Sequence, residues 1–275
     1  MTVSNIPHEI LSLEKRIGRR VTHVPLNQLH TEKVAFSTEG ESVIALSLRG
    51  CGLQQVPDAV CELKSLQVLS LGENEIANLP VNISELSQLK QFYLFNNPVG
   101  KLPEEIGEMT ELETLDIGHN ALNSIPDSIG ELKKLQFLYV SDNKLSALPS
   151  SLAELDQLVY LGMTDNHFTE LPASVCRLFS LKELRIYNNK ITRLPDTIAH
   201  LSGLRELHAR SNQLTELPEA IGKLQNLYYL DLRGNLMSEL PASIGKLKGL
   251  RKLDLRWNRF TSKPDVLSRT CLVYI

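Results

Sequence analysis

The residues that most resemble a catalytic pair are two aspartates 23 positions apart, Asp231 and Asp254. On adjacent parallel strands their carboxylates would lie about 5 Å apart, a separation found in retaining glycosidases. That chemistry needs one carboxylic acid that keeps its proton. Arginines follow both aspartates, and a neighbouring cation favours the charged form of each carboxyl group. An open sheet also encloses no sugar, so the pair does not predict a glycosidase.

A second set of chemically capable residues is His119, Asp142 and Asp165, which also recur every 23 residues. They could gather a divalent cation, but an exposed column offers no closed coordination shell. The chain has four cysteines and no C-x-x-C pair, which is typical of small buried thiols in a reducing compartment. Phosphate-binding, dinucleotide-binding and nucleophile-elbow motifs are absent from the sequence. We therefore expect no catalytic residues, no metal, no cofactor and no enzyme activity.

These spacings belong to a unit of 23 residues that recurs ten times without insertion or deletion. One copy runs through Leu135, Leu138, Val140 and Asn143 to Pro149. The asparagine recurs at Asn74, Asn97, Asn120, Asn166, Asn189, Asn212, Asn235 and Asn258, with Cys51 in the first copy. The proline recurs at Pro57, Pro80, Pro103, Pro126, Pro172, Pro195, Pro218, Pro241 and Pro264. A period of this length predicts a solenoid.

Each repeat must contain a short strand, because apolar residues alternate before the asparagine. Alternation directs Leu69 and Leu71 inward, and Val68, Ser70 and Gly72 outward. Successive strands then stack in parallel. The asparagine side chain, with donors and an acceptor, is expected to bond turn backbone within and between repeats. The proline is expected to begin a short helical segment on the opposite side.

Three parts follow from this pattern: an N-terminal helical cap over 1–42, ten repeats over 43–266, and a capping strand over 267–275. In the cap, Pro7 through Ile17 predicts an amphipathic helix with Ser4 or Asn5 as its N-cap, and Ile10, Leu13 and Ile17 are expected to share its apolar face. The run 271–275 predicts an eleventh strand with an unpaired edge. This strand is a natural cap, or pairs with another chain, or marks a sequence that stops inside a longer protein.

The pattern L-x-x-L-x-L-x-x-N-x-[IL]-x-x-[IL]-P-x-x-[IL]-G-x-L resembles the 23-residue leucine-rich repeats of intracellular scaffolds. Examples are the plant Ras-group-related proteins, the scribble/erbin group and bacterial leucine-rich repeat proteins. The resemblance implies an α/β solenoid, a right-handed horseshoe with a parallel sheet on the concave face and short helical segments on the convex face. It also implies protein binding on the concave face. The departures are Cys51 for asparagine, Phe92 for leucine and Ala209 for leucine or isoleucine.

Function is expected at outward positions that do not follow the repeat. Seven of the fifteen aromatic residues occupy such positions, and exposed aromatic residues commonly anchor interfaces. They are Tyr93, Phe95, Phe137, Tyr139, Tyr160, Tyr187 and Tyr229, and Trp257 lies at the rim. They form a partner-binding patch, or they stabilise the sheet through cross-strand contacts such as Phe137 with Tyr160.

The other half of the same face is charged. Its residues are Arg185, His208, Arg210, Asp231, Arg233, Asp254 and Arg256. Two interpretations stay open: a solvated face whose charges neutralise one another, or a rim that orients an oppositely patterned partner.

Bulk composition narrows the class of partner. A net charge of −3 over 275 residues argues against non-specific nucleic-acid binding. No apolar run approaches the length of a membrane span, and the N-terminus has no secretory pattern. We expect a cytoplasmic protein (alternatively a delivered effector without a cleaved signal peptide) that is monomeric, with self-association through the C-terminal edge strand as a second possibility.

Together these observations predict a non-enzymatic protein–protein interaction module that binds a partner protein on its concave face. Two alternatives stay open: the substrate-recognition arm of a larger enzyme or secreted effector, and an inhibitor that wraps an enzyme. The sequence does not specify the partner.

Overall fold

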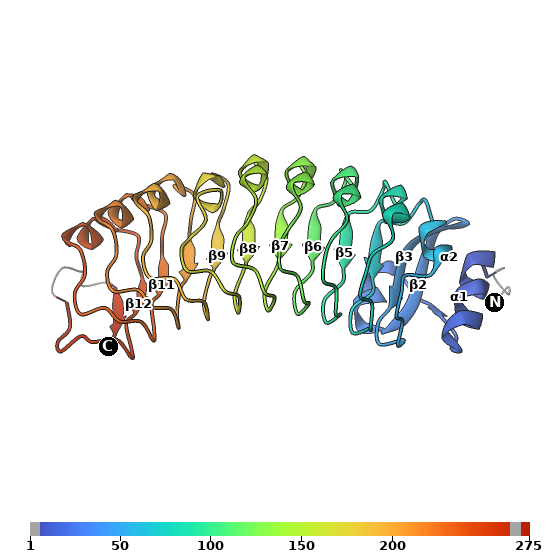
Figure 1. Cartoon of the computed structure of the whole chain (residues 1–275), viewed down its shortest axis with the longest axis horizontal. Coiled ribbons are helices and arrows are strands. Elements are labelled where there is room, and N and C mark those ends of the chain that lie inside the picture. Colours follow the sequence, from blue (N-terminus) through green and yellow to red (C-terminus); the bar gives the residue numbers. More distant parts are fainter. Residues whose placement is uncertain (1–5, 265–270) are drawn as a thin grey trace. The chain divides into compact units, whose positions relative to one another are not determined.

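The computed structural model describes residues 6–264 and 271–275. It forms two compact units, Met1–Leu135 and Gln136–Ile275. Ser4 and Asn5, expected to cap the first helix, and residues 265–267 at the end of the repeats lie outside the described residues. In each unit, short helices lie along one side of the chain and strands along the other (Figure 1).

The first unit begins with the helix that the sequence predicts, α1 (His8–Ile17). Ile10 and Leu13 are fully buried, and Ile17 is half-buried. Pro7 occupies the N-cap position, where no side chain caps the helix. The helix ends at Gly18, whose left-handed φ of 65° permits the chain to turn away.

The rest of the first 42 residues differs from the expected helical cap. It contains β1 (Thr22–His23), the 3-10 helix η1 (Leu26–Thr31) and β2 (Val34–Glu39), which pairs antiparallel with β3 (Ser42–Leu48). Gly40, with φ of 60°, lies in the hairpin turn. On its other side β3 pairs in parallel with the first following repeat strand. Strand β2 therefore covers the open edge of the first repeat strand, β3, and the 23-residue period gives no signal for it.

Parallel pairing continues through β4 (Val68–Ser70), β5 (Gln91–Tyr93) and β6 (Thr114–Asp116). Partner residues are 23 positions apart, as in Leu69 opposite Phe92. The helical segments of this unit are α2 (Asp58–Cys61), η2 (Val81–Glu85), η3 (Glu104–Glu108) and η4 (Asp127–Glu131).

The second unit repeats this arrangement. Its strands are β7 (Phe137–Tyr139), β8 (Tyr160–Gly162), β9 (Glu183–Arg185), β10 (Glu206–His208), β11 (Tyr229–Asp231), β12 (Lys252–Asp254) and β13 (Leu272–Tyr274). Its 3-10 helices are η5 (Ser150–Glu154), η6 (Val175–Arg177), η7 (Asp196–His200), η8 (Glu219–Lys223) and η9 (Ala242–Lys246). Strand β13 pairs in parallel with β12, which confirms the expected eleventh strand.

Most of the short helices are 3-10 helices that begin directly after the repeated proline. In η4, the Ile129 amide donates to the Pro126 carbonyl at 3.1 Å. The proline supplies an acceptor and lacks an N–H that would need a partner there. The inward columns form the core: Leu138, Leu161 and Leu184 have no exposed surface, and the departures Phe92 and Ala209 are buried equally well.

The asparagine column behaves as the sequence predicts. The Asn97 amide nitrogen donates to the carbonyls of Leu71, Leu94 and Phe95 at 3.0–3.2 Å. Its oxygen accepts from the Ile76 amide at 3.0 Å. Asn97 thus pairs buried backbone groups of its own repeat and of the preceding one, which the sheet cannot reach. Cys51 has no amide group for this role, and its own N–H donates to the Asn74 oxygen at 2.9 Å.

The cysteines are free thiols. Cys61, Cys176 and Cys271 are buried, and Cys51 is half-buried. Burial raises the pKa of the Cys61 thiol to about 11, so this group is inert at neutral pH. The expectation of small buried residues is confirmed for Cys61 and Cys176.

Candidate protein-interaction surface

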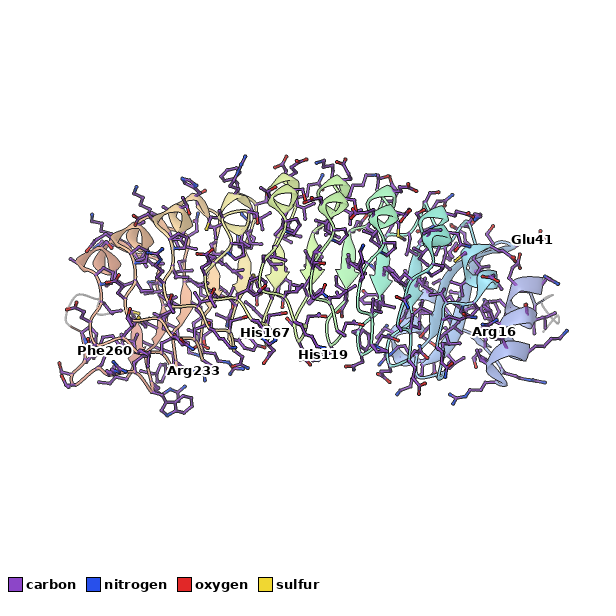
Figure 2. All side chains as sticks on the ribbon, in the orientation of Figure 1. Arg16, Glu41, His119, His167, Arg233 and Phe260 are labelled. Atoms are coloured by element: carbon purple, nitrogen blue, oxygen red, sulfur yellow. The ribbon has the colours of Figure 1, made fainter. Side chains whose placement is uncertain are left out.

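We call the side of the strands opposite the core the exposed sheet face. It comprises the outward residues of each strand and the residue three positions after the strand's central apolar residue, such as Arg233 after Leu230. On the second unit this face carries aromatic rings first and cations later. Arg233, for example, lies on the side of the chain opposite the short helices (Figure 2).

Tyr139 and Tyr160 are the central aromatic contact of this face. Their ring centroids are 4.7 Å apart and the rings are tilted by 35°. Tyr160 packs against Gly162, and the Arg185 guanidinium lies 5.5 Å from its ring centre. Burial raises the pKa of Tyr160 to about 12. Phe137 lies opposite Tyr160 on the neighbouring strand, as expected, but it is 37% exposed, and the ring contact of Tyr160 is with Tyr139, diagonally across the strands.

Cations lie over most of the remaining rings. Arg210 is 4.4 Å from the Tyr187 ring, and Lys252 is 4.6 Å from the Tyr229 ring. The His208 ring meets Tyr229 edge-on at 5.0 Å. Such contacts order the long cationic side chains and keep their charged ends at the surface.

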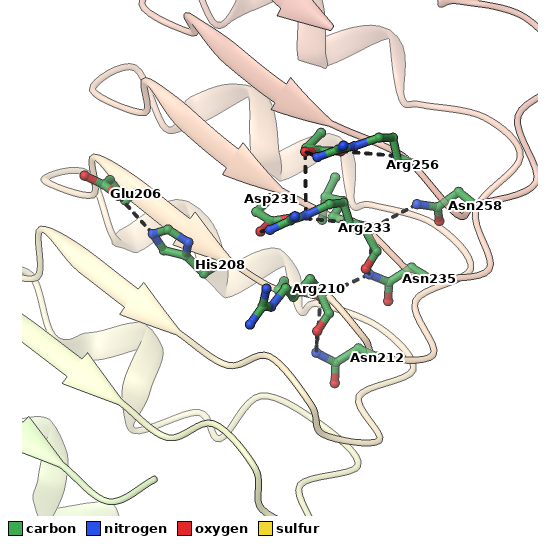
Figure 3. A network of polar contacts seen from close by, with 12 residues as sticks. Glu206, His208, Arg210, Asn212, Asp231, Arg233, Asn235, Arg256 and Asn258 are labelled. Carbon is green, nitrogen blue, oxygen red and sulfur yellow. Dashed lines mark hydrogen bonds and ion pairs between the residues drawn. The ribbon is translucent and has the colours of Figure 1, made fainter. Parts of the chain in front are cut away.

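Two aspartate–arginine pairs lie at the charged end of the face (Figure 3). The Arg233 guanidinium donates to both Asp231 oxygens at 2.9 and 2.6 Å, and Arg256 does the same to Asp254 at 2.9 and 2.7 Å. Arg233 also lies 3.6 Å from Asp254. These two-point contacts are the strong form of a charge-assisted hydrogen bond. Figure 3 shows Arg256 above Arg233 and Asp231, with Asn258, Asn235 and Asn212 to their right.

The aspartates of these pairs are buried, whereas the arginines are partly exposed. Asp231 and Asp254 are each 1% exposed, whereas the side chains of Arg233 and Arg256 are 21% and 43% exposed. Burial alone would raise the pKa of Asp254, but hydrogen bonds and charge from Arg256 and Arg233 outweigh it and hold that pKa below its usual value. Both aspartates therefore lie beneath the arginines, whereas the solvated face that was one of the two interpretations of the sequence would have left them exposed. The carboxylates do not reach the surface themselves.

A further cluster joins Glu183, Glu206 and His208 on β9 and β10. The His208 Nε2 atom lies 2.9 Å from Glu206 and 3.6 Å from Glu183, and the three groups lie within 4.8 Å of one another. The Arg185 Nε also donates to Glu183 at 2.6 Å, and the Tyr228 hydroxyl donates to Glu206. The sequence analysis missed both glutamates. Their shared outward column, two positions before Arg185 and His208, was the available signal.

Trp257 is the most exposed aromatic residue of the chain that the structure describes, at 74%. Its backbone is left-handed, with φ of 61°. The same position in other repeats is held by Gly50, Glu73, Asn96, His119, Asp142, Asp165, Asn188, Ser211 and Gly234. A bulky residue is disfavoured in this conformation, so Trp257 is both exposed and strained. The Arg256 guanidinium lies 5.7 Å from its ring.

The remaining predicted residues, Tyr93 and Phe95, belong to the first unit and are half-buried. The Phe95 ring covers Gly72 and lies 5.3 Å from the Arg49 guanidinium, and the Tyr93 hydroxyl donates to Gln91 at 3.2 Å. They border a cavity of about 420 Å³ between η1 and strands β3–β5, which we call the N-terminal pocket. His119 is exposed in this unit, while Asp142 and Asp165 belong to the other.

Within residues 6–264 and 271–275, the structure contains no helix with the length and apolar character needed to cross a membrane. No curated protein matches the chain in sequence. Solved structures do match it, and three show the range of similarity.

The first is the leucine-rich repeat ectodomain of the plant membrane receptor kinase GASSHO1/SCHENGEN3 from Arabidopsis thaliana, in complex with CASPARIAN STRIP INTEGRITY FACTOR 2. It is 29% identical with a TM-score of 0.72, and the match covers 86% of this chain and 29% of that one. The ectodomain of the Arabidopsis receptor kinase HAESA, in complex with an N-terminally extended IDA peptide hormone, is 30% identical with a TM-score of 0.72 and coverages of 84% and 41%.

The functional domain of InlJ from Listeria monocytogenes shares the fold at 21% identity, with a TM-score of 0.69 and coverages of 81% and 46%. The chain spans less than half the length of each of these three structures. A family described as a leucine-rich repeat region matches residues 45–116, 82–158 and 200–270, and a second leucine-rich repeat family matches residues 156–214. With its parallel strands and asparagine column, the chain belongs to the leucine-rich repeat family.

Proposed function

We propose that this chain is a non-enzymatic protein-binding module that docks an acidic partner protein on the exposed sheet face of the unit Gln136–Ile275. One observation carries the proposal: on this face the carboxylates of Asp231 and Asp254 are buried while the guanidiniums that cover them are exposed. The surface offered to a partner is therefore cationic and aromatic.

The charged residues on this face also favour an acidic partner. The outward positions of β9–β12 and the positions after them hold five bases and four acids, and two of the four acids are buried. The bases are Arg185, Arg210, Arg233, Lys252 and Arg256; the acids are Glu183, Glu206, Asp231 and Asp254. An acidic partner gains attraction along this face without having to displace the internal pairs. This replaces the oppositely patterned partner considered from the sequence.

The aromatic residues would supply the apolar part of the interface. Tyr139 and Tyr160 are half-buried against each other, so they are already ordered, and ordered aromatic residues lose little entropy on binding. The GASSHO1/SCHENGEN3 and HAESA structures contain peptide or protein ligands, which supports protein binding for a related fold. A cytoplasmic location and a monomeric state are parts of the same proposal.

The test is affinity capture from a lysate with quantitative mass spectrometry, using four baits. They are the wild type, Tyr139→Ala/Tyr160→Ala, Arg210→Glu and Lys223→Glu. Lys223→Glu is the matched control, because it makes the same charge change on η8, away from the sheet face. Circular dichroism melts confirm that each bait is folded.

We expect an acidic protein that the wild type and Lys223→Glu retain, that Arg210→Glu retains weakly, and that the double tyrosine variant loses. Truncating two interface aromatic residues should cost at least about 2 kcal/mol of binding free energy, or roughly 30-fold in Kd. Binding of the same proteins by all four baits would refute the proposal.

A further inference from the structure

The N-terminal pocket lies between η1, which precedes the repeats, and the outward side chains of the first repeat strands. Its floor is formed by Ser47, Val68, Ser70 and Gln91 on strands β3–β5. One wall is η1, through Leu26, Leu29 and His30. The opposite wall is Arg49, Tyr93 and Phe95. A volume of about 420 Å³ lies in the range of pockets that hold ligands.

Two features keep this space open. The first is the small side chains of Ser47 and Ser70, in the column where later repeats carry Tyr139 or Arg185. The second is a fixed wall: Leu29 is 5% exposed and packs with Val24, Ala35 and Ala45. Because the wall belongs to the core, the pocket exists before any ligand binds, which reduces the entropic cost of binding.

The charges around the pocket select for an anion. Arg49 is the only arginine or lysine in the described lining, which contains no aspartate or glutamate. The Arg49 guanidinium and the Lys33 ammonium group share one carboxylate, Glu73, each at 2.5 Å. Two cations with one acid leave a net positive charge beside the pocket. The buried Arg49 Nε atom also has no hydrogen-bond partner among the described residues.

The apolar walls select for a large apolar group. Leu26, Leu29, Val68 and Phe95 line the cavity, and Leu26 is 48% exposed at its lip. The pocket opens onto the exposed sheet face of the first unit, so a chain that places a side chain in it can continue across the strands. The Gln91 oxygen accepts from Tyr93, and its amide hydrogens can serve a ligand carbonyl.

We propose that the N-terminal pocket binds a large apolar side chain of a partner protein whose adjacent residue is acidic and pairs with Arg49. The proposal rests on the proposed function in one respect, that the chain binds proteins. It assigns a recognition site in the unit Met1–Leu135, separate from the face of the second unit.

The test is selection of random heptapeptides displayed on phage, using the full chain as target. Ser70→Tyr fills the pocket; it should fold, because Tyr93 holds the same outward position on the next strand. Thr114→Tyr is the matched control, since it adds a tyrosine to the same sheet face outside the pocket lining. Leu26→Glu changes the exposed lip, so it tests the pocket again if Ser70→Tyr does not fold.

We expect the wild type and Thr114→Tyr to enrich peptides in which Phe, Tyr, Trp or Leu adjoins Asp or Glu. Ser70→Tyr and Leu26→Glu should enrich none. A synthetic peptide carrying the enriched pair should bind Arg49→Gln about tenfold more weakly than wild type, while its alanine-for-acid analogue binds both equally. Equal enrichment on Ser70→Tyr, basic residues beside the apolar one, or no enrichment on any target would overturn the inference.

The same variants separate this site from the proposed function. Tyr139→Ala/Tyr160→Ala should enrich the same peptides as wild type, because its changes lie in the other unit. If Ser70→Tyr retains the captured acidic partner and no peptide pair is enriched, the pocket proposal fails and the proposed function stands. If peptides are enriched but no captured partner depends on Tyr139 and Tyr160, the proposed function of the second unit fails and the pocket proposal stands.

Discussion

Arg233 should stabilise the fold because it covers a buried carboxylate. Replacing it by glutamine removes hydrogen bonds of 2.9 and 2.6 Å to Asp231 and a 3.6 Å contact with Asp254. Asp231, which is 1% exposed beneath Arg233, would lose its cation and stay next to the second carboxylate, Asp254. Removing one partner of a buried pair costs about 3–5 kcal/mol. Because the Arg233 side chain is 21% exposed, we expect the lower end, about 3 kcal/mol.

Urea unfolding followed by circular dichroism measures this loss. A change of about 3 kcal/mol should lower the midpoint by roughly 1 M urea. The double variant Arg233→Gln/Asp231→Asn should recover most of the loss, because a neutral amide pair leaves no buried charge. A loss below about 0.5 kcal/mol for Arg233→Gln, or a double variant no more stable than the single one, would refute the covered-carboxylate argument.

Three other predictions follow from described contacts. Asn189→Ala leaves the carbonyls of Met163, Ile186 and Tyr187 and the Phe168 amide without their side-chain partner. Urea unfolding should show that the free energy of unfolding falls by about 3 kcal/mol. Lys190→Ala, at the exposed neighbouring position, should change it little. Trp257→Asn should raise stability by about 1 kcal/mol, because Asn96 and Asn188 already hold this left-handed position; lower thermal stability of the variant would contradict the strain. The pKa of Asp254 is lowered in the folded state, so ionised Asp254 stabilises the fold fully above the unfolded-state pKa of about 3.9, and this stabilisation is lost as pH falls through the folded-state pKa. Asp254→Asn should therefore flatten the pH dependence of the melting temperature below about pH 4. An unchanged pH profile would count against this role of Asp254.

Much of the fold could be predicted from the sequence because every repeat has the same alternation of apolar residues, the same asparagine and the same proline at fixed spacing. Alternation identifies Leu69 and Leu71 as core, and both are fully buried. The polar asparagine after the strand predicts its bonds to the turn backbone. The hairpin of β2 and β3 was missed because its pairing joins a non-repeat segment to the first repeat, and the period carries no information about such a contact.

The candidate site was only partly predictable. Outward alternation correctly places Tyr139, Tyr160 and the arginines on the sheet face, but it treats every outward residue as exposed. The burial of Asp231 and Asp254 depends on arginine side chains that fold back two residues, and strand periodicity does not encode that geometry. The N-terminal pocket depends on η1 lying over β3–β5, a tertiary contact that Ser47 and Ser70 do not reveal from their spacing.

The asparagine column also has a direction along the chain. The Leu53 amide, in the first repeat, is paired by the oxygen of Asn74, 21 residues later, and the Leu48 carbonyl by its amide nitrogen, 26 residues later. During synthesis from the N-terminus, a repeat's turn therefore cannot be completed until the next asparagine has left the ribosome. Each newly emerged repeat locks the one before it, so folding on the ribosome should advance in steps of 23 residues, always one repeat behind the growing end.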